Sequence, residues 1–344
     1  ISPFIWALLI TSLSTSTLIT MSSHHWLLAW LGLELNTLSI LPMIIKPHHP
    51  RATEAATKYF LIQAAAAALI LFSSTLNAWQ TGHWSITNIS TPAATVTITI
   101  AIMLKLGIAP THAWYPEVLQ GATMNTALIL STWQKLAPLT LLYLMKNSLP
   151  NSLILTIGAL SILVGGWAGL NQTQTRKIMA MSSIAHMGWL IIALNMSLDI
   201  ATMTLAVYIL LTTTMFTSFN ITTTKTLADL GVTWPQSPVL FVIMLITLLS
   251  LGGLPPLTGF APKWLILTSL CHTKLFMLSV MIVIASLPSL FFYIRMTYLA
   301  TLTAPPNTTN AQHKWRHKMS HPWALGPTMV MAGLLLPLTP LMAT

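Results

Sequence analysis

The sequence is poor in cysteine and in charged residues. Cys271 is the single cysteine in 344 residues, so this chain alone can form neither a disulfide framework nor a cysteine-ligated zinc or iron–sulfur site. Charged residues make up 6% of the sequence, whereas soluble domains contain about 25%. We therefore expect neither a soluble fold nor redox chemistry inside the chain.

Basic residues are absent from the first part of the chain. No lysine or arginine precedes Lys46, so the basic region of a signal peptide and the arginine-rich face of a transit peptide are both missing. We expect the first apolar segment, 3–21, to be retained. The net charge is +10, but the cations lie in short loops between apolar runs, a pattern that favours membrane topology over nucleic-acid binding.

Long hydrophobic runs dominate what is present. Hydrophobic residues make up 54% of the chain and the mean hydropathy is +0.74. Because about 20 apolar residues cross a bilayer, the sequence predicts an all-α polytopic membrane protein with about eleven transmembrane helices. The predicted spans are 3–21, 25–45, 57–78, 92–110, 123–145, 150–170, 176–195, 199–222, 238–268, 275–299 and 323–342.

We expect one transmembrane domain over 1–344, with a first half of about 1–170, a second half of about 171–300, and a C-terminal loop and helix at 301–344.

Eleven spans place alternate loops on opposite faces of the membrane, and the cations divide unequally between the two faces. Only Lys146 and Lys274 fall on one face. By the positive-inside rule, the amino terminus lies inside and the carboxyl terminus outside. The cations on the inner face are Lys46, Arg51, Lys58, Arg176, Lys177, Lys225, Arg295, Lys314, Arg316 and Lys318.

Glycine and proline interrupt two of the predicted spans. The segments Leu106-Gly107-x-x-Pro110 and Leu251-Gly252-x-x-Pro255 resemble each other, and paired interruptions in the two halves of a membrane protein indicate an inverted repeat with an ion site at the breaks. Each break frees backbone groups that must face protein or water. The interrupting residues are Gly107 and Pro110 in the fourth span, and Gly252, Gly253, Pro255 and Pro256 in the ninth.

Four ionisable residues lie within predicted spans: Glu34, Lys105, Lys135 and Lys263. Such residues are costly in hydrocarbon and mark ion or proton pathways. A lysine held out of water can release and rebind a proton near neutral pH, and a nearby carboxylate favours its charged form. The alternative is that each lysine extends to the membrane interface and only its stem is buried.

Hydroxyl groups precede one of these lysines. Ser131 and Thr132 lie four and three residues before Lys135, so on a continuous helix both would share its face. Outside the spans, Glu54 precedes Lys58 by four residues and is expected to support the start of a helix.

Histidines offer further candidates. His186, in the seventh span, and His112, after the first break, could relay protons between lysines, or each could simply be hydrogen-bonded within the fold. His313, His317 and His321 recur every four residues, but the cations among them would repel a metal. We therefore interpret that segment as a basic interfacial loop and predict no metal site.

Several segments together resemble a known family. From Lys105 the chain reads Lys-x4-Pro-x-His-x-Trp-x-Pro-Glu-x3-Gly, ending at Gly121. This resembles the signature of the antiporter-like subunits of respiratory complex I and of multisubunit cation/proton antiporters. Similar to other segments of that family are Trp30-x-Gly32-x-Glu34, Ser182–Gly188, and Gly252–Phe260 with Lys263.

The resemblance implies a core membrane subunit of an H⁺-translocating NADH:ubiquinone reductase, with proton transfer driven by quinone reduction elsewhere in the complex. It also implies that Glu34 and Lys105 form a pair, that Lys135 is the central relay, and that Lys263 is the terminal lysine. The sequence departs from many relatives at Leu130, near which they carry a histidine; here Lys135 follows about a turn later.

The resemblance further implies partners, cofactors and location. FMN, iron–sulfur clusters and ubiquinone are expected in partner subunits and none in this chain, which would be an obligate hetero-oligomer surrounded by lipids. It would lie in the mitochondrial inner membrane, with the amino terminus on the matrix side and the carboxyl terminus on the intermembrane-space side. Two alternatives stay open: a stand-alone cation/proton antiporter module, and a membrane scaffold that conducts nothing.

Overall fold

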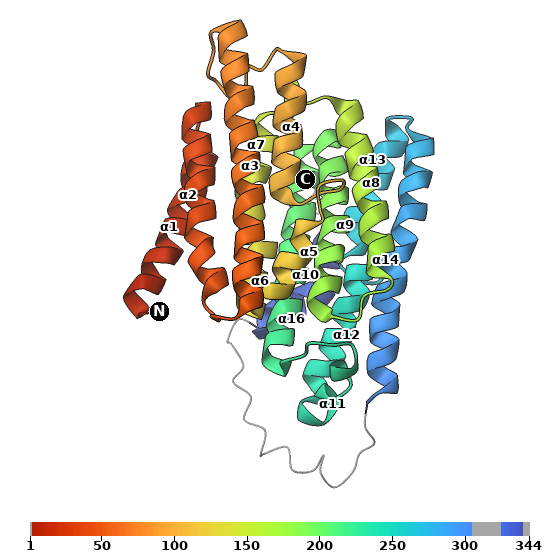
Figure 1. The fold of residues 1–344 in the computed structure, drawn as a ribbon. Helices are drawn as coiled ribbons and strands as arrows, with labels where there is room; N and C mark the ends of the chain where they lie inside the picture. The colour runs from red at the N-terminus through yellow and green to blue at the C-terminus, as the bar shows by residue number, and fades with distance from the viewer. Residues whose placement is uncertain (1, 305–324, 340–344) are drawn as a thin grey trace. The chain divides into compact units, whose positions relative to one another are not determined.

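The computed structural model describes residues 2–304 and 325–339, and helices are the only extended regular structure in those ranges. Two isolated backbone bridges, His25 with Ser85 and Gln174 with Thr226, are the only β-type pairings within them. The predicted all-α class is therefore confirmed (Figure 1). The α-helices are α1 (Pro3–Ser22), α2 (Trp26–Ile45), α3 (Pro50–Thr81), α4 (Pro92–Leu106), α5 (Trp114–Gly121), α6 (Met124–Ser131), α7 (Trp133–Leu144), α8 (Asn151–Gly169), α9 (Thr175–Met196), α10 (Leu198–Thr222), α11 (Thr233–Gln236), α12 (Pro238–Gly252), α13 (Phe260–His272), α14 (Phe276–Leu302) and α16 (Leu325–Leu334).

Within the described ranges, seven helices are long and apolar enough to cross a membrane: α1, α2, α3, α8, α9, α10 and α14. Three shorter apolar helices, α4, α12 and α16, fall in other predicted spans. The predicted eleventh span, 323–342, is described only in part. The histidines at 313, 317 and 321, with their basic neighbours, lie outside the described residues.

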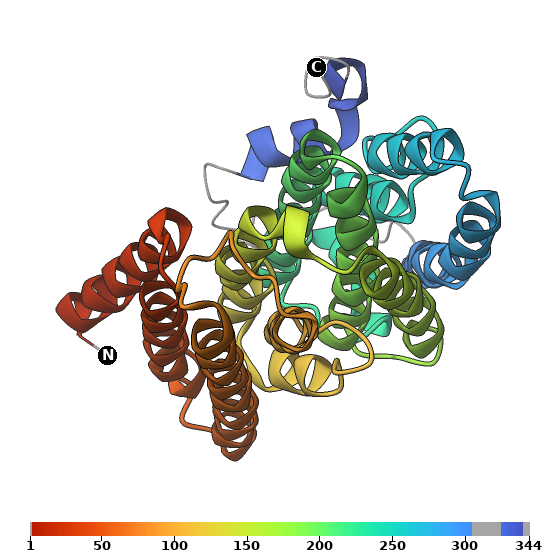
Figure 2. The ribbon, with the colours of Figure 1, turned by 90° about the horizontal axis from the view of Figure 1, so that it is seen from above.

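The chain divides by its internal contacts into two compact units, 1–157 and 158–344. In the first unit, α3 packs against α2, α4 and α5, while α7 contacts α1, α2, α4 and α6. In the second unit, α10 contacts α9, α12, α13 and α16, and α14 packs on α12 and α13. Figure 2, seen from above, shows several of these helices end-on.

Helix starts follow from local capping chemistry. Proline occupies the first turn of α1, α3, α4 and α12, where its missing N–H costs no hydrogen bond. His25 and His49 cap α2 and α3: each Nδ1 accepts from the N–H two residues on, at 3.2 and 3.1 Å. Thr123 and Ser197 cap α6 and α10 with hydroxyl oxygens.

The two predicted breaks occur, and both are built in the same way. Gly107 ends α4 with φ of 70° and Gly253 ends α12 with φ of 81°, a left-handed conformation that favours glycine. The following N–H groups bond back five residues, from Ile108 to Met103 at 3.1 Å and from Leu254 to Leu249 at 3.5 Å, as in a Schellman cap. The glycine equivalent to Gly107 is thus Gly253, one residue later than the sequence pairing indicated.

A third interruption was not expected. The predicted helix over 123–145 is wrong as a continuous element, because α6 ends at Ser131 and α7 begins at Trp133. The Ser131 and Thr132 hydroxyls both donate to the Leu128 carbonyl, at 2.9 and 2.7 Å, a contact that bends helices. That these two hydroxyls lie beside Lys135 stays a prediction.

Candidate functional site

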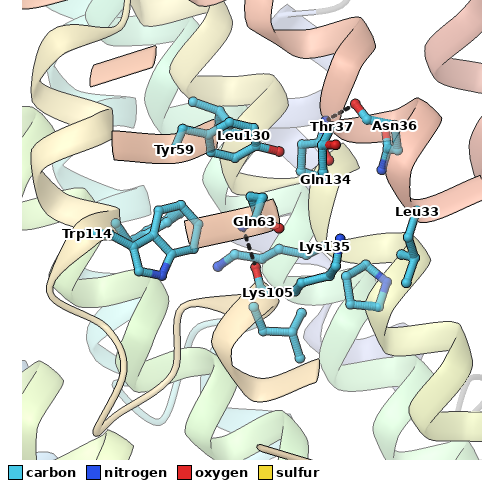
Figure 3. A pocket seen from close by; sticks show the side chains of 13 residues that line it. Leu33, Asn36, Thr37, Tyr59, Gln63, Lys105, Trp114, Leu130, Gln134 and Lys135 are labelled. Carbon is cyan, nitrogen blue, oxygen red and sulfur yellow. Dashed lines mark hydrogen bonds between the residues drawn. The ribbon is translucent and has the colours of Figure 1, made fainter. Parts of the chain in front are cut away.

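Lys105 and Lys135 line one buried pocket in the first unit (Figure 3). Lys105 is in the last turn of α4, immediately before the break at Gly107, and Lys135 is in the first turn of α7. Their side chains are only 6% and 3% exposed, so neither extends to the surface of the unit. This burial argues against the interfacial alternative for both lysines.

Polar side chains from neighbouring helices surround these lysines. Gln63, on α3, donates to the backbone carbonyl of Lys105 at 3.3 Å, and Gln134 donates to the carbonyl of Asn36 at 3.4 Å. The space left inside the pocket is about 20 Å³, which is enough for a water molecule but too small for an organic cofactor. The pocket is therefore suited to water and protons.

Glu34 lies on α2 and interacts electrostatically with Lys105. Glu34 and Lys105, which both lie within the described ranges, do not form an ion pair within 4.0 Å. Within the same ranges, the buried Oε2 of Glu34 and the Nζ of Lys105 make no hydrogen bond. The two groups therefore influence each other through their charges and not through a direct bond.

Lys58, unlike the lysines in the pocket, forms ion pairs at the surface. Its Nζ lies 2.5 Å from Glu54 Oε1 and 2.6 Å from Glu117 Oε2. The expected pairing of Glu54 with Lys58 is present within α3, and the contact with Glu117 joins α3 to α5. These groups are 40–59% exposed, so the ion pairs contribute little to stability.

A second pocket, in the second unit, contains Lys263 and His186. Lys263, on α13, donates from Nζ to the carbonyl of Gly252 at 2.8 Å. That carbonyl lies at the carboxyl end of α12, where the helix break leaves it without a helical partner and where the helix dipole favours a cation. Lys263 therefore contacts the backbone at the second helix break.

The two predicted histidines differ in their surroundings. His186 Nε2 lies 3.5 Å from the Tyr293 hydroxyl, and its ring centroid is 5.9 Å from that of Tyr208. His112 Nδ1 lies 3.2 Å from the carbonyl of Pro110, within its own loop. His112 lines neither lysine pocket, whereas His186 shares the second pocket with the partly buried Lys263.

Sequence reasoning did not identify the other polar residues that line the two pockets, which include Gln63, Tyr115, Gln134 and Tyr208. It also missed Tyr293, which contacts His186. Each has a polar or phenolic side chain among apolar neighbours in the sequence, and this property could have identified it as a candidate. No group of three histidine, cysteine or acidic side chains suited to a metal occurs within the described residues. The absence of a resident cofactor stays a prediction.

Broken membrane helices that carry buried lysines define an antiporter-like class of polytopic membrane protein. Residues 23–289 match the family model described as "NADH:quinone oxidoreductase/Mrp antiporter, TM", and residues 290–343 match "NADH dehydrogenase subunit 2 C-terminus". The chain belongs to this family of NADH:quinone oxidoreductase and Mrp antiporter membrane subunits. The resemblance stated from the sequence motifs is thereby confirmed.

Curated relatives are similar over their full lengths. The chain is 48% identical to NADH-ubiquinone oxidoreductase chain 2 of Xenopus laevis, over 100% of both chains. It is 50% identical to the protein of the same name from Polypterus ornatipinnis, over 98% of both.

Two solved structures share the fold. The chain is similar to a chain of respiratory complex I from Thermus thermophilus, with a TM-score of 0.83 and 26% identity, covering 99% of this chain and 78% of that one. Its similarity to the Mrp complex from Dietzia sp. has a TM-score of 0.82 at 14% identity, covering 97% and 75%. The second likeness concerns the fold alone.

Proposed function

We propose that this chain is a membrane subunit of the proton-translocating NADH:ubiquinone oxidoreductase and that its buried lysines carry protons. The observation that supports this most directly is the pocket shared by Lys105 and Lys135. Two ammonium groups in one small buried space repel each other, so the gain of a proton by one favours its loss from the other. The site is thus suited to passing a proton from one lysine to the other.

The remaining residues extend this proposal. Glu34 would modulate the charge of Lys105, because a carboxylate near a lysine side chain favours the protonated form of that lysine. Lys263, with His186 beside it, would hold and transfer protons in the second unit. His112 would be a second relay, placed in the loop after the first break. The two halves, 1–170 and 171–300, would form the inverted repeat of one domain.

Quinone reduction would drive this transfer from elsewhere in the complex. Moving one charge against a membrane potential costs about 2.3 kcal/mol per 100 mV, so the proton affinities of the lysines must alternate between states. FMN, iron–sulfur clusters and ubiquinone would be bound by partner subunits. We place the chain in the mitochondrial inner membrane, with the amino terminus facing the matrix and the carboxyl terminus facing the intermembrane space.

Neutral substitutions at the buried lysines test the proposal. Lys105→Gln and Lys135→Gln would be introduced into the assembled complex, which is then reconstituted in vesicles containing a pH-sensitive dye. NADH-driven proton uptake and coupled quinone reduction should collapse, while assembly and electron transfer from NADH to an artificial acceptor persist. Lys274→Gln, at an exposed loop position, removes the same charge outside both pockets and should leave uptake unchanged.

The outcomes separate the alternatives. Normal proton uptake in both lysine variants would contradict the proposal and favour a scaffold whose lysines are structural. Proton exchange that depends on sodium or potassium and proceeds without NADH would instead favour a stand-alone antiporter.

A further inference from the structure

His186, which lines the second pocket, makes a contact that the lysine pathway does not use. Tyr293, on α14, is 1% exposed, and its hydroxyl lies 3.5 Å from Nε2 of His186 on α9. The same hydroxyl also interacts with Ser182, one turn before His186. A phenol is normally buried this deeply only where its hydroxyl finds a polar partner.

Tyr293 also reaches the helix break. A Cβ atom placed on Gly252 would lie 3.8 Å from the Cβ and Cδ2 atoms of Tyr293, so the tyrosine ring lies directly against this glycine. The Gly252 carbonyl is the acceptor for Lys263 Nζ, and Lys263 and His186 line the same pocket. One side chain therefore contacts both the histidine and the residue that holds the lysine.

We propose that Tyr293 is a positioning residue that orients the His186 imidazole beside Lys263, so that His186 can exchange a proton in this pocket. A phenolic hydroxyl can donate to Nε2 of neutral imidazole and, after rotation about its C–O bond, accept from the Nε2–H of imidazolium. It can therefore hold the ring in either charge state. Phenylalanine fills the same space and can do neither.

The inference rests on the proposed function and deepens it, because it makes proton transfer in the second unit depend on a residue that is not itself a carrier. The titratable groups that face His186 are Lys263 from α13, Tyr208 from α10 and Tyr293 from α14. Lys263 and Tyr293 both contact Gly252 at the break, Lys263 through its hydrogen bond to the carbonyl and Tyr293 through its ring.

The test is Tyr293→Phe in the assembled complex, measured as NADH-driven proton uptake over a range of pH. We expect uptake at neutral pH to fall by about tenfold, the size of effect that accompanies loss of a hydrogen bond to a charged group. Imidazolium loses its acceptor, so the pH dependence should also move to lower pH, by up to about one unit. Tyr298→Phe, on the same helix but 60% exposed, removes the same atom and should change neither quantity.

A double substitution tests whether Tyr293 acts through His186. In a His186→Gln chain, adding Tyr293→Phe should cause no further loss, because the ring that it positions is gone. An equal loss in both backgrounds would overturn the inference, as would a Tyr293→Phe complex with unchanged uptake and pH profile. Failure of that variant to assemble would also overturn it, since the hydroxyl would then serve folding.

The two proposals fail differently. If Lys105→Gln and Lys135→Gln abolish proton uptake while Tyr293→Phe behaves like the parent, the inference is wrong and the proposed function stands. If the lysine variants take up protons normally, the proposed function fails, whatever Tyr293→Phe does.

Discussion

The Nζ atom of Lys135 lies 5.0 Å from the centre of the Tyr115 ring. Tyr115 is on α5, directly after the first helix break, and its ring makes an edge-to-face contact with Trp114 at 5.6 Å between centroids. A Cβ atom on Gly107 would lie 3.2 Å from both of these aromatic residues. The break that follows Lys105 is thus packed against the ring that contacts Lys135.

The aromatic face of Tyr115 should stabilise the charged form of Lys135. A cation–π contact is worth about 0.5–2 kcal/mol, more when water is excluded. We expect Tyr115→Phe to retain most of the proton uptake, because the ring remains, and Tyr115→Leu to lose it several-fold. Uptake in reconstituted vesicles measures both. Equal losses in the two variants would point to the hydroxyl instead of the ring.

Gly107→Ala should destabilise the first break. Alanine pays about 1–2 kcal/mol in the left-handed conformation, and its Cβ would press on Trp114 and Tyr115 at 3.2 Å. Gly82, with φ of 75° and no atom within 4 Å of an added Cβ, is a matched control for the conformational cost alone. The thermal unfolding midpoint should fall further for Gly107→Ala than for Gly82→Ala. An equal fall of the midpoint in both variants would mean that Trp114 and Tyr115 move aside without loss of stability.

Gly253→Ala should displace Lys263. An added Cβ would lie 2.8 Å from Lys263 Nζ and 3.0 Å from its Cδ, so the lysine must leave its position beside the Gly252 carbonyl. We expect proton uptake to fall toward that of Lys263→Gln even where the complex assembles. A cryo-EM map of the variant would show whether Nζ has moved, and an unmoved lysine would contradict this account.

Asp229 gives a pH-dependent prediction outside the membrane helices. Its carboxylate accepts from the N–H groups of Thr226 at 2.8 Å and of Lys225 at 3.0 Å, and these bonds hold its pKa below the usual value. A lowered pKa means that the stabilisation is complete above the pKa of the unfolded chain, about 3.9, and is lost as pH falls through the folded value.

The measurement is amide hydrogen exchange in the segment that connects α10 with α12. At neutral pH, Asp229→Asn should speed exchange by roughly three- to tenfold, the effect of losing about one hydrogen bond. The difference from the parent should shrink as the parent's carboxyl is protonated in acid. A difference that is constant with pH would exclude the carboxylate as its cause.

The helix breaks were predictable because glycine and proline act locally. Gly107 and Pro110 could be identified as an interruption without knowledge of any neighbour, since their effect lies in their own backbones. The choice between Gly252 and Gly253 could not be made, because adjacent glycines satisfy the same pattern and only the hydrogen bonds of the cap distinguish them. The interruption at Thr132 has neither residue at the break, and it depends on hydroxyls that could equally have faced outward.

The lysines themselves were also predictable, because a charge in an apolar run is conspicuous. Their neighbours were not. Gln63 is 42 positions from Lys105 and Tyr293 is 107 positions from His186. Such pairs are set by which helix faces meet, and helical periodicity alone leaves that choice open.

The bond from Lys263 to Gly252 joins α13 to the end of α12 across the loop between them. An ammonium donates a stronger hydrogen bond to a carbonyl than a neutral amine does. The hydrogen bond that connects α12 and α13 is therefore stronger when Lys263 is charged and weaker when it is neutral. Protonation of one side chain would in this way stiffen the connection at the second helix break.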